Sequence, residues 1–375
     1  MKIAIDATIV RKENTGVGFY VINLLSGLCR ADDHNEYYIF MNKNLLSELS
    51  IIKKKNINII HKNFKSRFFR IFWQLFILPF NLRSMKISLL HSTNYITPLI
   101  KIGFKIIVTI HDFTFYLFPE KYTIMKRIFY KSFIPFFIKI SDKVITDSNN
   151  TKKDIFKIFN ISERKITVIY VSYQEYYNNI KNNDLSKKIL MKYNINRNFI
   201  LFVGMIEPRK NILSILKAFI EIDEELDLDL VIVGKKGWYF KEIDNFMEKI
   251  KGLKLTNKII FTGYVPEKEI KYFYQSALIF VFPSFYEGFG LPPLQAMACG
   301  TPVITSNVSS LPEVVGDSAI RIDPNNLEEL TNSIKLLYNN PAKRSELIRK
   351  GLKQAKKFNL IRIAKKTISI YETFK

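Results

Sequence analysis

The sequence predicts an α/β protein made of two doubly wound domains that face each other across a cleft. The chain has 375 residues, more than a single hydrophobic core usually supports. Short apolar segments alternate with helical segments in two consecutive series, a pattern typical of parallel sheets covered by helices. The polar stretch Tyr173–Asn198 separates the two series and suits a linker. We expect domains over residues 1–190 and 191–358, and a final helix over residues 359–375.

The first series opens with a strand, a glycine-containing turn and a helix. Gly16 and Gly18 lie between the apolar run Lys2–Ala7 and the helical pattern Phe19–Arg30. Such a turn lets a phosphate approach a helix N-terminus, although Val21 stands where the dinucleotide fingerprint has its third glycine. The further strands expected in this series are Tyr37–Phe40, Ile57–Ile60, Ile87–Leu90, Ile106–Asp112, Lys143–Asp147 and Ile166–Val171.

The segment Phe64–Lys86 is aromatic, apolar and basic, and it has two interpretations. Arg70 and Gln74 interrupt its apolar run, which is too short to cross a membrane. A basic amphipathic helix of this kind can lie in a membrane interface. The alternative, which we prefer, is a core helix that packs on the first sheet.

His111 and Asp112 close the expected strand Ile106–Asp112, and His91 closes its predecessor. Ligand sites in open α/β sheets cluster at this carboxyl edge. His111 is therefore a candidate site residue, with an ordinary structural histidine as the alternative. Asp112 and His91 are equally well explained as site residues or structural ones.

Neither the histidines nor the acidic pairs indicate a metal centre. The four histidines and two cysteines lack zinc-site spacing. Asp227-Leu228-Asp229 has the form of a metal-binding pair, but it leads straight into a core strand. We therefore interpret it as structural and expect neither a metal nor a resident cofactor.

The second series carries a cationic turn after its first strand. Arg209 and Lys210 lie between that strand and the expected helix Ile212–Phe219, where a diphosphate would find two cations beside a helix dipole. The alternative is a solvent-exposed charge run. The expected strands are Phe199–Val203, Leu230–Val233, Lys258–Thr262, Leu278–Phe282, Val303–Thr305 and Ala319–Ile322.

An acidic, glycine-containing loop follows the fourth of these strands. Glu287 lies beside Gly288, and Gly290 precedes Leu291-Pro292-Pro293, a helix start. Phosphate would repel the carboxylate, so a sugar or ribose hydroxyl is its expected partner. The alternative is an ordinary strand–helix connection with a surface glutamate.

Net charge is +23 and is concentrated in the first half. Residues 1–200 carry an excess of 18 positive charges and residues 201–375 an excess of 5, and no acid occurs between Ser50 and Ile110. Such a surface attracts nucleic acid, anionic lipid headgroups or an acidic acceptor, with the membrane preferred to nucleic acid. A basic surface with no partner is equally well supported.

Glu287 through Gln295 resembles the Glu-x7-Glu signature of the group 1 (family 4) retaining glycosyltransferases, with Gln295 in place of the second glutamate. Glutamine keeps an acceptor oxygen, so ribose binding can survive without the strength of a charge-assisted hydrogen bond. The resemblance implies the GT-B fold, in which both domains are Rossmann-like and the C-terminal helix crosses back to the first domain.

The resemblance also assigns expected roles to residues of this chain. The expected catalytic residues are His111, Asp112 and Glu287, and the donor phosphates are expected at Gly16, Gly18, Arg209 and Lys210. The nucleotide is expected at Gly204, Tyr264, Val265 and Gln295. The donor sugar is expected at His111, Glu287, Gly288, Phe289, Gly290 and Leu291.

The expected reaction is retaining transfer of a hexose from a nucleotide diphosphate sugar to a hydroxyl of a glycan or lipid-linked acceptor. The resemblance extends to bacterial surface-polysaccharide mannosyltransferases of O-antigen, lipopolysaccharide or capsule synthesis, so GDP-mannose is the first expected donor and a UDP-sugar the second. The alternatives are a GT-B sugar-nucleotide epimerase, a non-catalytic nucleotide-sugar-binding relative and, less favoured, a nucleic-acid-binding protein.

We expect the protein in the cytoplasm, with peripheral contact at the inner face of the cell membrane as an addition. Only Cys29 and Cys299 are present, far apart in the sequence, which fits a reducing compartment. Met1-Lys2 leads directly into the first strand, so no signal peptide is expected.

Overall fold

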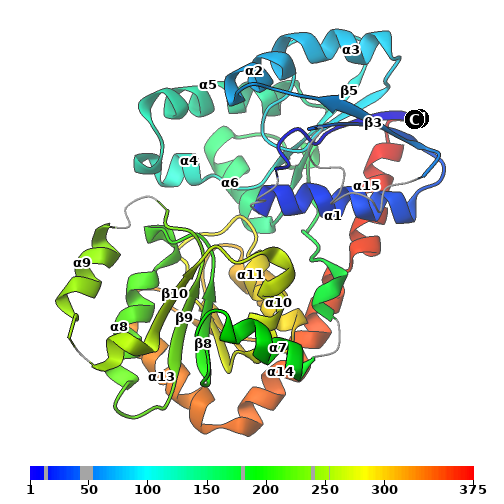
Figure 1. Cartoon of the computed structure of the whole chain (residues 1–375). Coiled ribbons are helices and arrows are strands. Elements are labelled where there is room, and N and C mark those ends of the chain that lie inside the picture. The colour runs from blue at the N-terminus through cyan, green and yellow to red at the C-terminus, as the bar shows by residue number, and fades with distance from the viewer. Residues whose placement is uncertain (12–15, 43–53, 179–181, 238–240, 253) are drawn as a thin grey trace. The chain divides into compact units, whose positions relative to one another are not determined.

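The computed structural model describes the chain except for residues 12–15, 43–53, 179–181, 238–240 and 253 (Figure 1). The chain forms two compact units. Unit 1 comprises Met1–Gln174 and Phe358–Lys375, and unit 2 comprises Glu175–Lys357. The boundary precedes the expected position at residue 190 because α7 (Asn183–Met191) packs on α10 (Glu267–Ser276) within unit 2.

Unit 1 is built on a seven-stranded parallel sheet in the order β3-β2-β1-β4-β5-β6-β7. The strands are β1 (Lys2–Asp6), β2 (Glu36–Asn42), β3 (Ile57–Lys62), β4 (Leu89–Ser92), β5 (Lys105–Ile110), β6 (Lys143–Thr146) and β7 (Ile166–Val168). The central strands are buried on both faces, which explains why most of their residues are apolar. All seven coincide with segments expected from the sequence.

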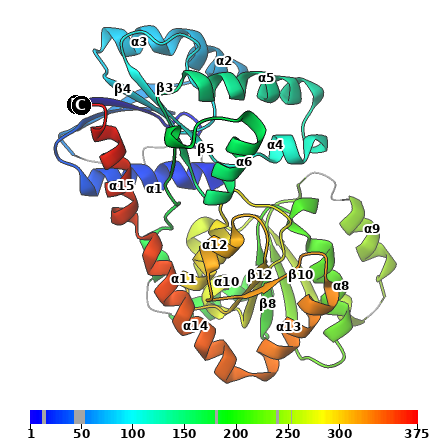
Figure 2. The same cartoon turned by 180° about the vertical axis from the view of Figure 1, so that it is seen from behind.

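The helices of unit 1 come from both ends of the chain. They are α1 (Gly16–Ala31), α2 (Arg67–Phe72), α3 (Leu78–Ser84), α4 (Thr114–Leu117), α5 (Ile124–Ile140), α6 (Asn149–Phe159) and α15 (Leu360–Glu372), with a π-helical turn η2 (Trp73–Ile77) between α2 and α3. Figures 1 and 2 show α15 against α1, as the fold class implies. Gly27 permits this contact, because a Cβ there would lie 2.8 Å from Ala364 Cβ.

The segment that had two interpretations packs on the core with one face. Its residues Trp73, Leu78 and Leu82 are buried against the first sheet, which confirms the core-packing prediction. Its other face stays exposed, including Phe68 and Phe80. In the described part of the chain, no helix is long and apolar enough to cross a membrane.

Unit 2 contains a six-stranded parallel sheet in the order β10-β9-β8-β11-β12-β13. Its strands are β8 (Phe199–Val203), β9 (Asp229–Val233), β10 (Ile259–Gly263), β11 (Ile279–Phe282), β12 (Val303–Ser306) and β13 (Ile320–Ile322). Its remaining helices are α8 (Ile212–Ile222), α9 (Lys241–Lys249), α11 (Leu291–Ala298), α12 (Leu311–Val315), α13 (Leu327–Asn339) and α14 (Pro341–Ala355). Asp227 and Asp229 both pair with Arg197, in line with a structural role.

Each sheet has one point where the strand order reverses. In unit 1 this point lies between β1 and β4, and in unit 2 between β8 and β11. Connections leave these neighbouring strands in opposite directions, so a crevice opens at their carboxyl ends where open α/β sheets bind ligands.

Candidate active site

The cationic turn of unit 2 leaves β8 at the reversal point. Pro208–Lys210 forms a single 3-10 turn, and Asn211 takes a left-handed conformation with φ 56° before α8 begins. The Asn211 side chain holds this conformation, because its amide donates to Pro324 O at 2.7 Å. Arg209 and Lys210 are thereby placed beside the N-terminus of α8, as the sequence predicted.

The acidic loop leaves β11 on the other side of the reversal point. Gly290 adopts φ 109° immediately before α11, and a Cβ there would lie 2.8 Å from Leu311 Cδ2. Ser309 and Ser310 hold the loop from α12, because their hydroxyls donate to Glu287 O at 2.6 and 2.8 Å. Ser310 also donates to Phe289 O at 2.6 Å. The loop is therefore braced on both sides of Gly288.

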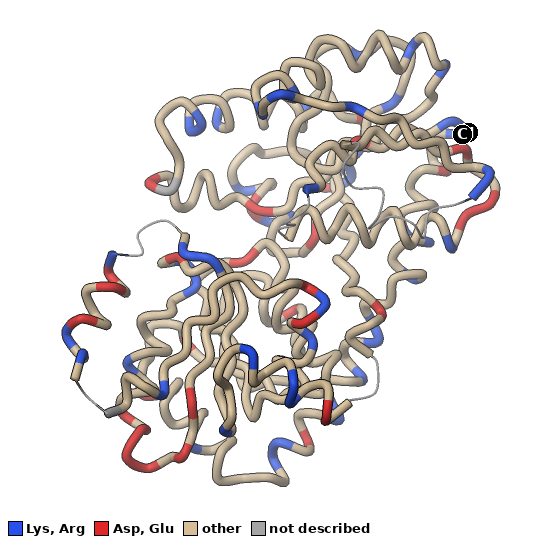
Figure 3. The backbone as a smooth tube through the Cα atoms, viewed as in Figure 1, with Lys and Arg blue, Asp and Glu red and all other residues tan. Residues whose placement is uncertain are grey.

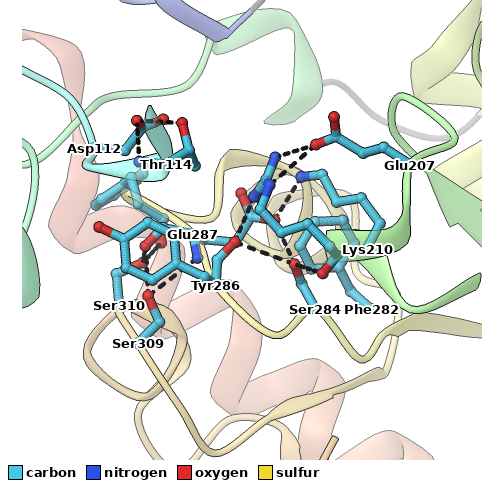
Figure 4. Close-up of polar contacts among 12 residues, drawn as sticks. Asp112, Thr114, Glu207, Lys210, Phe282, Ser284, Tyr286, Glu287, Ser309 and Ser310 are labelled. Atoms are coloured by element: carbon cyan, nitrogen blue, oxygen red, sulfur yellow. Dashed lines mark hydrogen bonds and ion pairs between the residues drawn. The ribbon is translucent and has the colours of Figure 1, made fainter. Parts of the chain in front are cut away.

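The two loops meet in one buried ionic cluster (Figure 4). Glu287 Oε1 lies 2.8 Å from Arg209 Nη1 and 2.5 Å from Lys210 Nζ, and it accepts from Ser284 Oγ at 2.7 Å. Arg209 donates through Nε and Nη2 to Glu207 Oε1 at 3.0 and 2.6 Å. Two carboxylates thus hold two cations in place where β8 and β11 separate.

The cluster controls the ionisation of its own members. Burial alone would raise the pKa of Glu287, but Arg209 and Lys210 outweigh it and lower this pKa to about 2. Burial, with the neighbouring Arg209 charge, lowers the pKa of Lys210, and Glu287 offsets part of that effect. The Lys210 ammonium also lies 4.7 Å from the centre of the Phe282 ring. Glu287 is consequently ionised at neutral pH and bound to both cations.

Of the residues expected at the nucleotide, Gly204 follows β8, and Tyr264 and Val265 follow β10 in the same sheet. Gly204, Gly234 and Gly263 end or follow β8, β9 and β10, and all three have positive φ. Gly234 has no room for a side chain, because a Cβ would lie 1.8 Å from Gly204 O. Tyr264 is partly exposed beneath the Lys235 ammonium, 4.7 Å from the ring centre, and Val265 is buried.

Gln295 lies inside α11 and is 6% exposed. Its Oε1 accepts a hydrogen bond of 3.3 Å from the Tyr274 hydroxyl of α10. The structure thus links the residue that replaces the second glutamate to a core tyrosine. Its expected contact with ribose stays a prediction. Leu291, another expected sugar contact, is the first residue of α11.

In unit 1, His111 is a buried, doubly bonded residue at the end of β5. Its Nδ1 lies 2.6 Å from Asp147 Oδ2, and its Nε2 lies 2.8 Å from Thr93 O. The backbone oxygen can only accept, so Nε2 carries a proton. Burial alone would lower the pKa of His111, but Asp147 outweighs it and raises this pKa. Asp147 thus favours the protonated, imidazolium form of His111, although burial also raises the pKa of the Asp147 carboxyl itself.

Asp112 serves a local purpose in this structure. Its Oδ1 accepts from Thr114 N at 3.0 Å and Thr114 Oγ1 at 2.8 Å, at the start of α4 (Figure 4). His91 is buried between the Tyr371 hydroxyl at 2.6 Å and Thr109 Oγ1 at 2.8 Å. Burial lowers the pKa of His91 to about 3, so it is a neutral structural residue.

The glycines of the first turn are only partly informative. Gly16 is the exposed first residue of α1, and Gly18 is buried in the same helix. The preceding residues 12–15 of the expected phosphate loop lie outside the described residues. The role of Gly16 and Gly18 at the donor phosphates stays a prediction. Among the described residues, no group of three His, Cys, Asp or Glu is arranged to hold a metal ion.

Sequence reasoning missed several residues that build these two clusters. Asp147 follows β6 as His111 follows β5, so the shared carboxyl edge of adjacent strands was the available signal. Gly234 repeats the Val-Gly ending of β8, which also marks it. Glu207 and Ser284 bond to Arg209 and Glu287, which are two and three residues away, but nothing in their residue types marked them. Ser309 and Ser310 gave no comparable signal, because their partner Glu287 lies 22 and 23 residues away in the sequence.

The chain has two doubly wound units, and in unit 2 a cationic turn and an acidic loop meet at the reversal point of the sheet. This architecture is that of the GT-B class of glycosyltransferases. Solved structures of this class are similar over the whole chain. A glycosyltransferase from Rickettsia africae superposes with TM-score 0.76 at 20% identity, covering 100% of this chain and 98% of its own. Anabaena HepE, in complex with UDP and glucose, superposes with TM-score 0.77 at 16% identity, covering 100% of both chains.

The sequence comparisons identify the family within this class. The "Glycosyl transferases group 1" family matches residues 186–354, and "Glycosyltransferase Family 4" matches residues 14–171. The chain belongs to these group 1 (family 4) glycosyltransferases. O-antigen chain mannosyltransferase B of Escherichia coli is 28% identical, covering 99% of this chain and 100% of its own. The Salmonella typhimurium O-antigen chain mannosyltransferase RfbU is 27% identical, covering 66% of this chain and 64% of its own.

Proposed function

We propose that this glycosyltransferase moves mannose, with retention, from GDP-mannose to a hydroxyl of a glycan or lipid-linked acceptor in surface-polysaccharide synthesis. A UDP-sugar is the second candidate donor. The observation that carries the proposal is the buried cluster of Arg209, Lys210 and Glu287 at the reversal point of unit 2. The choice of mannose is supported by the related O-antigen mannosyltransferases.

The cluster suits a reaction in which a diphosphate leaves. Negative charge grows on the leaving oxygens, and fixed cations in a water-poor site stabilise that charge without reorganising. Glu287 and Glu207 already hold Arg209 and Lys210 in place, so little side-chain freedom is lost when the donor binds. Among the described residues, the side-chain donors Arg209, Lys210 and Ser284 all contact Glu287 Oε1. We assign Oε2 to a hydroxyl of the donor sugar.

The chemistry needs no protein nucleophile or metal in this scheme. The leaving phosphate acts as the base toward the acceptor hydroxyl on the same face of the sugar, which gives retention. In this scheme His111 contributes a positive charge, which Asp147 holds in place. Both of its ring nitrogens already have a hydrogen-bond partner. It would act through its charge, and a contact with the sugar would require one of these hydrogen bonds to break.

Thermal denaturation with a panel of GDP, UDP and their sugars tests the donor site. A ligand at one hundred times its Kd adds about 2.7 kcal/mol of stability. We expect one nucleotide class to raise the Tm of the wild type and not that of Lys210→Ala. Lys251→Ala, at an exposed lysine of unit 2, should behave as wild type. A panel in which no nucleotide shifts the Tm would contradict the proposal.

A turnover assay distinguishes glycosyl transfer from epimerisation and from binding without catalysis. With the donor that binds, NMR of the product should show a new glycosidic bond whose anomeric configuration matches that of the donor. Release of an epimerised nucleotide sugar without acceptor would instead identify an epimerase. Donor binding without any turnover would identify a binding-only relative.

We also propose that unit 1 rests on the inner face of an anionic membrane. The outer face of α2, η2 and α3 carries exposed aromatic side chains, and α5 adds exposed apolar residues near its start. The most exposed are Phe68, Phe69, Phe80, Ile124, Met125 and Ile128. Lys and Arg occur along α2, α3 and α5 without acidic residues among them (Figure 3). Apolar insertion combined with basic charge is the composition that binds anionic lipid.

Vesicle co-sedimentation tests the membrane proposal. Wild type should sediment with vesicles containing phosphatidylglycerol and less so with neutral vesicles or in high salt. Phe68→Ser with Phe69→Ser should weaken sedimentation, whereas Leu336→Ser, at an exposed leucine of unit 2, should not. Equal binding of the double variant would exclude this face.

A further inference from the structure

The reversal point of unit 1 holds a second polar cluster that the proposed donor chemistry does not use. Asp6 ends β1 at this point, and Gln74 reaches it from the π-helical turn η2, donating through Nε2 to Asp6 Oδ2 at 2.5 Å. Thr8 donates to Asp6 Oδ1 through its backbone at 3.0 Å and its hydroxyl at 2.6 Å. Asp6, Thr8 and Gln74 are all buried.

Arg70 lies near enough to this cluster to interact electrostatically with Asp6. The residue is only 5% exposed, yet within the described part of the chain its Nη1 has no hydrogen-bond partner. Burial lowers the pKa of Arg70, and the Asp6 carboxylate only partly compensates. Both oxygens of that carboxylate already accept from Thr8 and Gln74. A buried guanidinium without a hydrogen-bonded counterion is costly, so it needs a specific explanation.

Gln74 has a second unused group. Its Oε1 is buried without a partner in the residues that the structure describes. Exchanging the amide atoms would place this oxygen against the Asp6 carboxylate, so the present orientation is the favourable one. Arg70 and Gln74 are four residues apart on one helical face, and π-helical turns are frequent at functional sites. About one helical turn apart, Arg70 and Gln74 therefore carry a buried donor and a buried acceptor that have no partner among the described residues.

Thr93 connects this cluster to the His111 pair along the sheet edge. Its hydroxyl donates to Asp6 O at 2.6 Å, and its carbonyl accepts from His111 at 2.8 Å. Thr93 therefore links the Asp6 cluster to the His111–Asp147 pair at the carboxyl edge of the sheet.

We propose that Arg70 and Gln74 form an acceptor site that binds an anionic oxygen on Arg70 and a hydroxyl on Gln74 Oε1. The inference rests on the proposed glycosyl transfer. An anionic oxygen could come from the diphosphate of a lipid-linked acceptor or from the carboxylate of an acidic sugar. Either one supplies the missing counterion of Arg70.

Ligand-observed saturation-transfer NMR on the full chain tests the site. The probes are a short-chain polyprenyl diphosphate, methyl glucuronide and the neutral methyl mannoside. The proteins are wild type, Arg70→Met, Arg70→Gln, Lys210→Ala and Arg83→Met, the last at an exposed arginine of α3. At least one anionic probe should bind wild type, Lys210→Ala and Arg83→Met, and about tenfold more weakly or not at all to both Arg70 variants. The probe that binds identifies the source of the anion.

The Tm values of the same samples separate a binding arginine from a folding one. Arg70→Met removes a buried charge without a counterion, so its Tm should equal or exceed that of wild type. A large fall in Tm for both Arg70 variants would overturn the inference, as would unchanged probe binding or no binding of either anion to wild type. Nucleotide-dependent stabilisation of wild type is recorded in parallel. If it is present without anion binding, only this inference fails, and if it is absent, the proposed function fails.

Discussion

Individual charged residues in this protein are buried in opposite circumstances. Glu287 is surrounded by donors and is ionised, whereas Arg70 is buried and its Nη1 has no hydrogen-bond partner in the part of the chain that the structure describes. Removing one partner of a buried ion pair is strongly destabilising, because it leaves the other charge uncompensated. The same reasoning predicts how Glu287 and His111 respond to pH.

Replacing Glu287 by glutamine should flatten the acid dependence of stability. The pKa of Glu287 is about 2 in the folded protein against an ordinary 4.5. A lowered carboxyl pKa contributes stability that is present above pH 4.5 and lost as pH falls toward 2, on the order of 3 kcal/mol. Urea titrations from pH 6 to pH 3 should show a steeper loss for wild type than for Glu287→Gln.

The control for this titration is Glu248→Gln, which alters an exposed carboxylate of α9. It should follow the wild-type curve. At pH 7, Glu287→Gln should also be less stable than wild type, because Lys210 and Arg209 lose their shared carboxylate. Parallel curves for wild type and Glu287→Gln would show that folding does not lower the pKa of Glu287.

Replacing Asp147 by asparagine should reverse the protonation of His111. The raised pKa of His111 depends on Asp147, so burial will dominate in Asp147→Asn and lower this pKa below 6.5. In wild type the pair contributes stability that is present below pH 6.5 and lost as pH rises through the raised pKa. A proton NMR titration, with the His111 signal assigned from His111→Gln, measures both states. An unchanged pKa would rule out the ion pair.

At the scale of elements, close packing of α1 and α15 completes unit 1. Gly27 brings the backbone of α1 near α15, where Leu360 O would lie 3.2 Å from an added Cβ. The hydroxyl of Tyr371, which belongs to α15, shares a hydrogen bond with the buried ring of His91 in β4. The C-terminal helix is therefore a structural part of the first unit.

Gly27→Leu should separate these two helices. The larger side chain cannot fit against Ala364 and Leu360, so we expect a loss of about 1–3 kcal/mol or more in the free energy of unfolding. Arg30→Leu, at an exposed position of α1, should change stability by less than about 0.5 kcal/mol. Chemical denaturation followed by circular dichroism measures both, and equal stabilities would mean that α15 does not need this contact.

At the scale of the whole molecule, the two ends of the chain belong to one folding unit. Unit 1 joins Met1–Gln174 with Phe358–Lys375, while α14 just before this segment packs on α11 in unit 2. Cooperative units in proteins open together, so amide exchange should follow the units and not the sequence order.

Native-state hydrogen exchange should therefore group α15 with α1. We expect the most protected amides of both helices to share one opening free energy in the wild type, and those of α14 to follow unit 2. Gly27→Leu should lower protection in α1 and α15 together. Exchange of α15 in step with α14 would contradict the division into these units.

Apolar periodicity by itself determined the two parallel sheets, because short buried strands need apolar residues on both faces wherever they occur. The turns Pro208–Lys210 and Gly288–Gly290 were also recognisable, since glycine, proline and paired cations have strong local preferences. Family resemblance then supplied the expected roles of Arg209, Lys210 and Glu287. These local signals need no knowledge of distant partners.

Only the tertiary structure decided how these groups are paired. Glu287 was expected to meet a sugar hydroxyl, and the fold also brings it to Arg209 and Lys210. Arg70 was visible only as an interruption of an apolar segment, and burial beside Asp6 turned it into a candidate ligand site. Pairings of this kind join residues from different strands, and strand order is set by packing of the whole sheet, so the sequence pattern of any one segment cannot contain them.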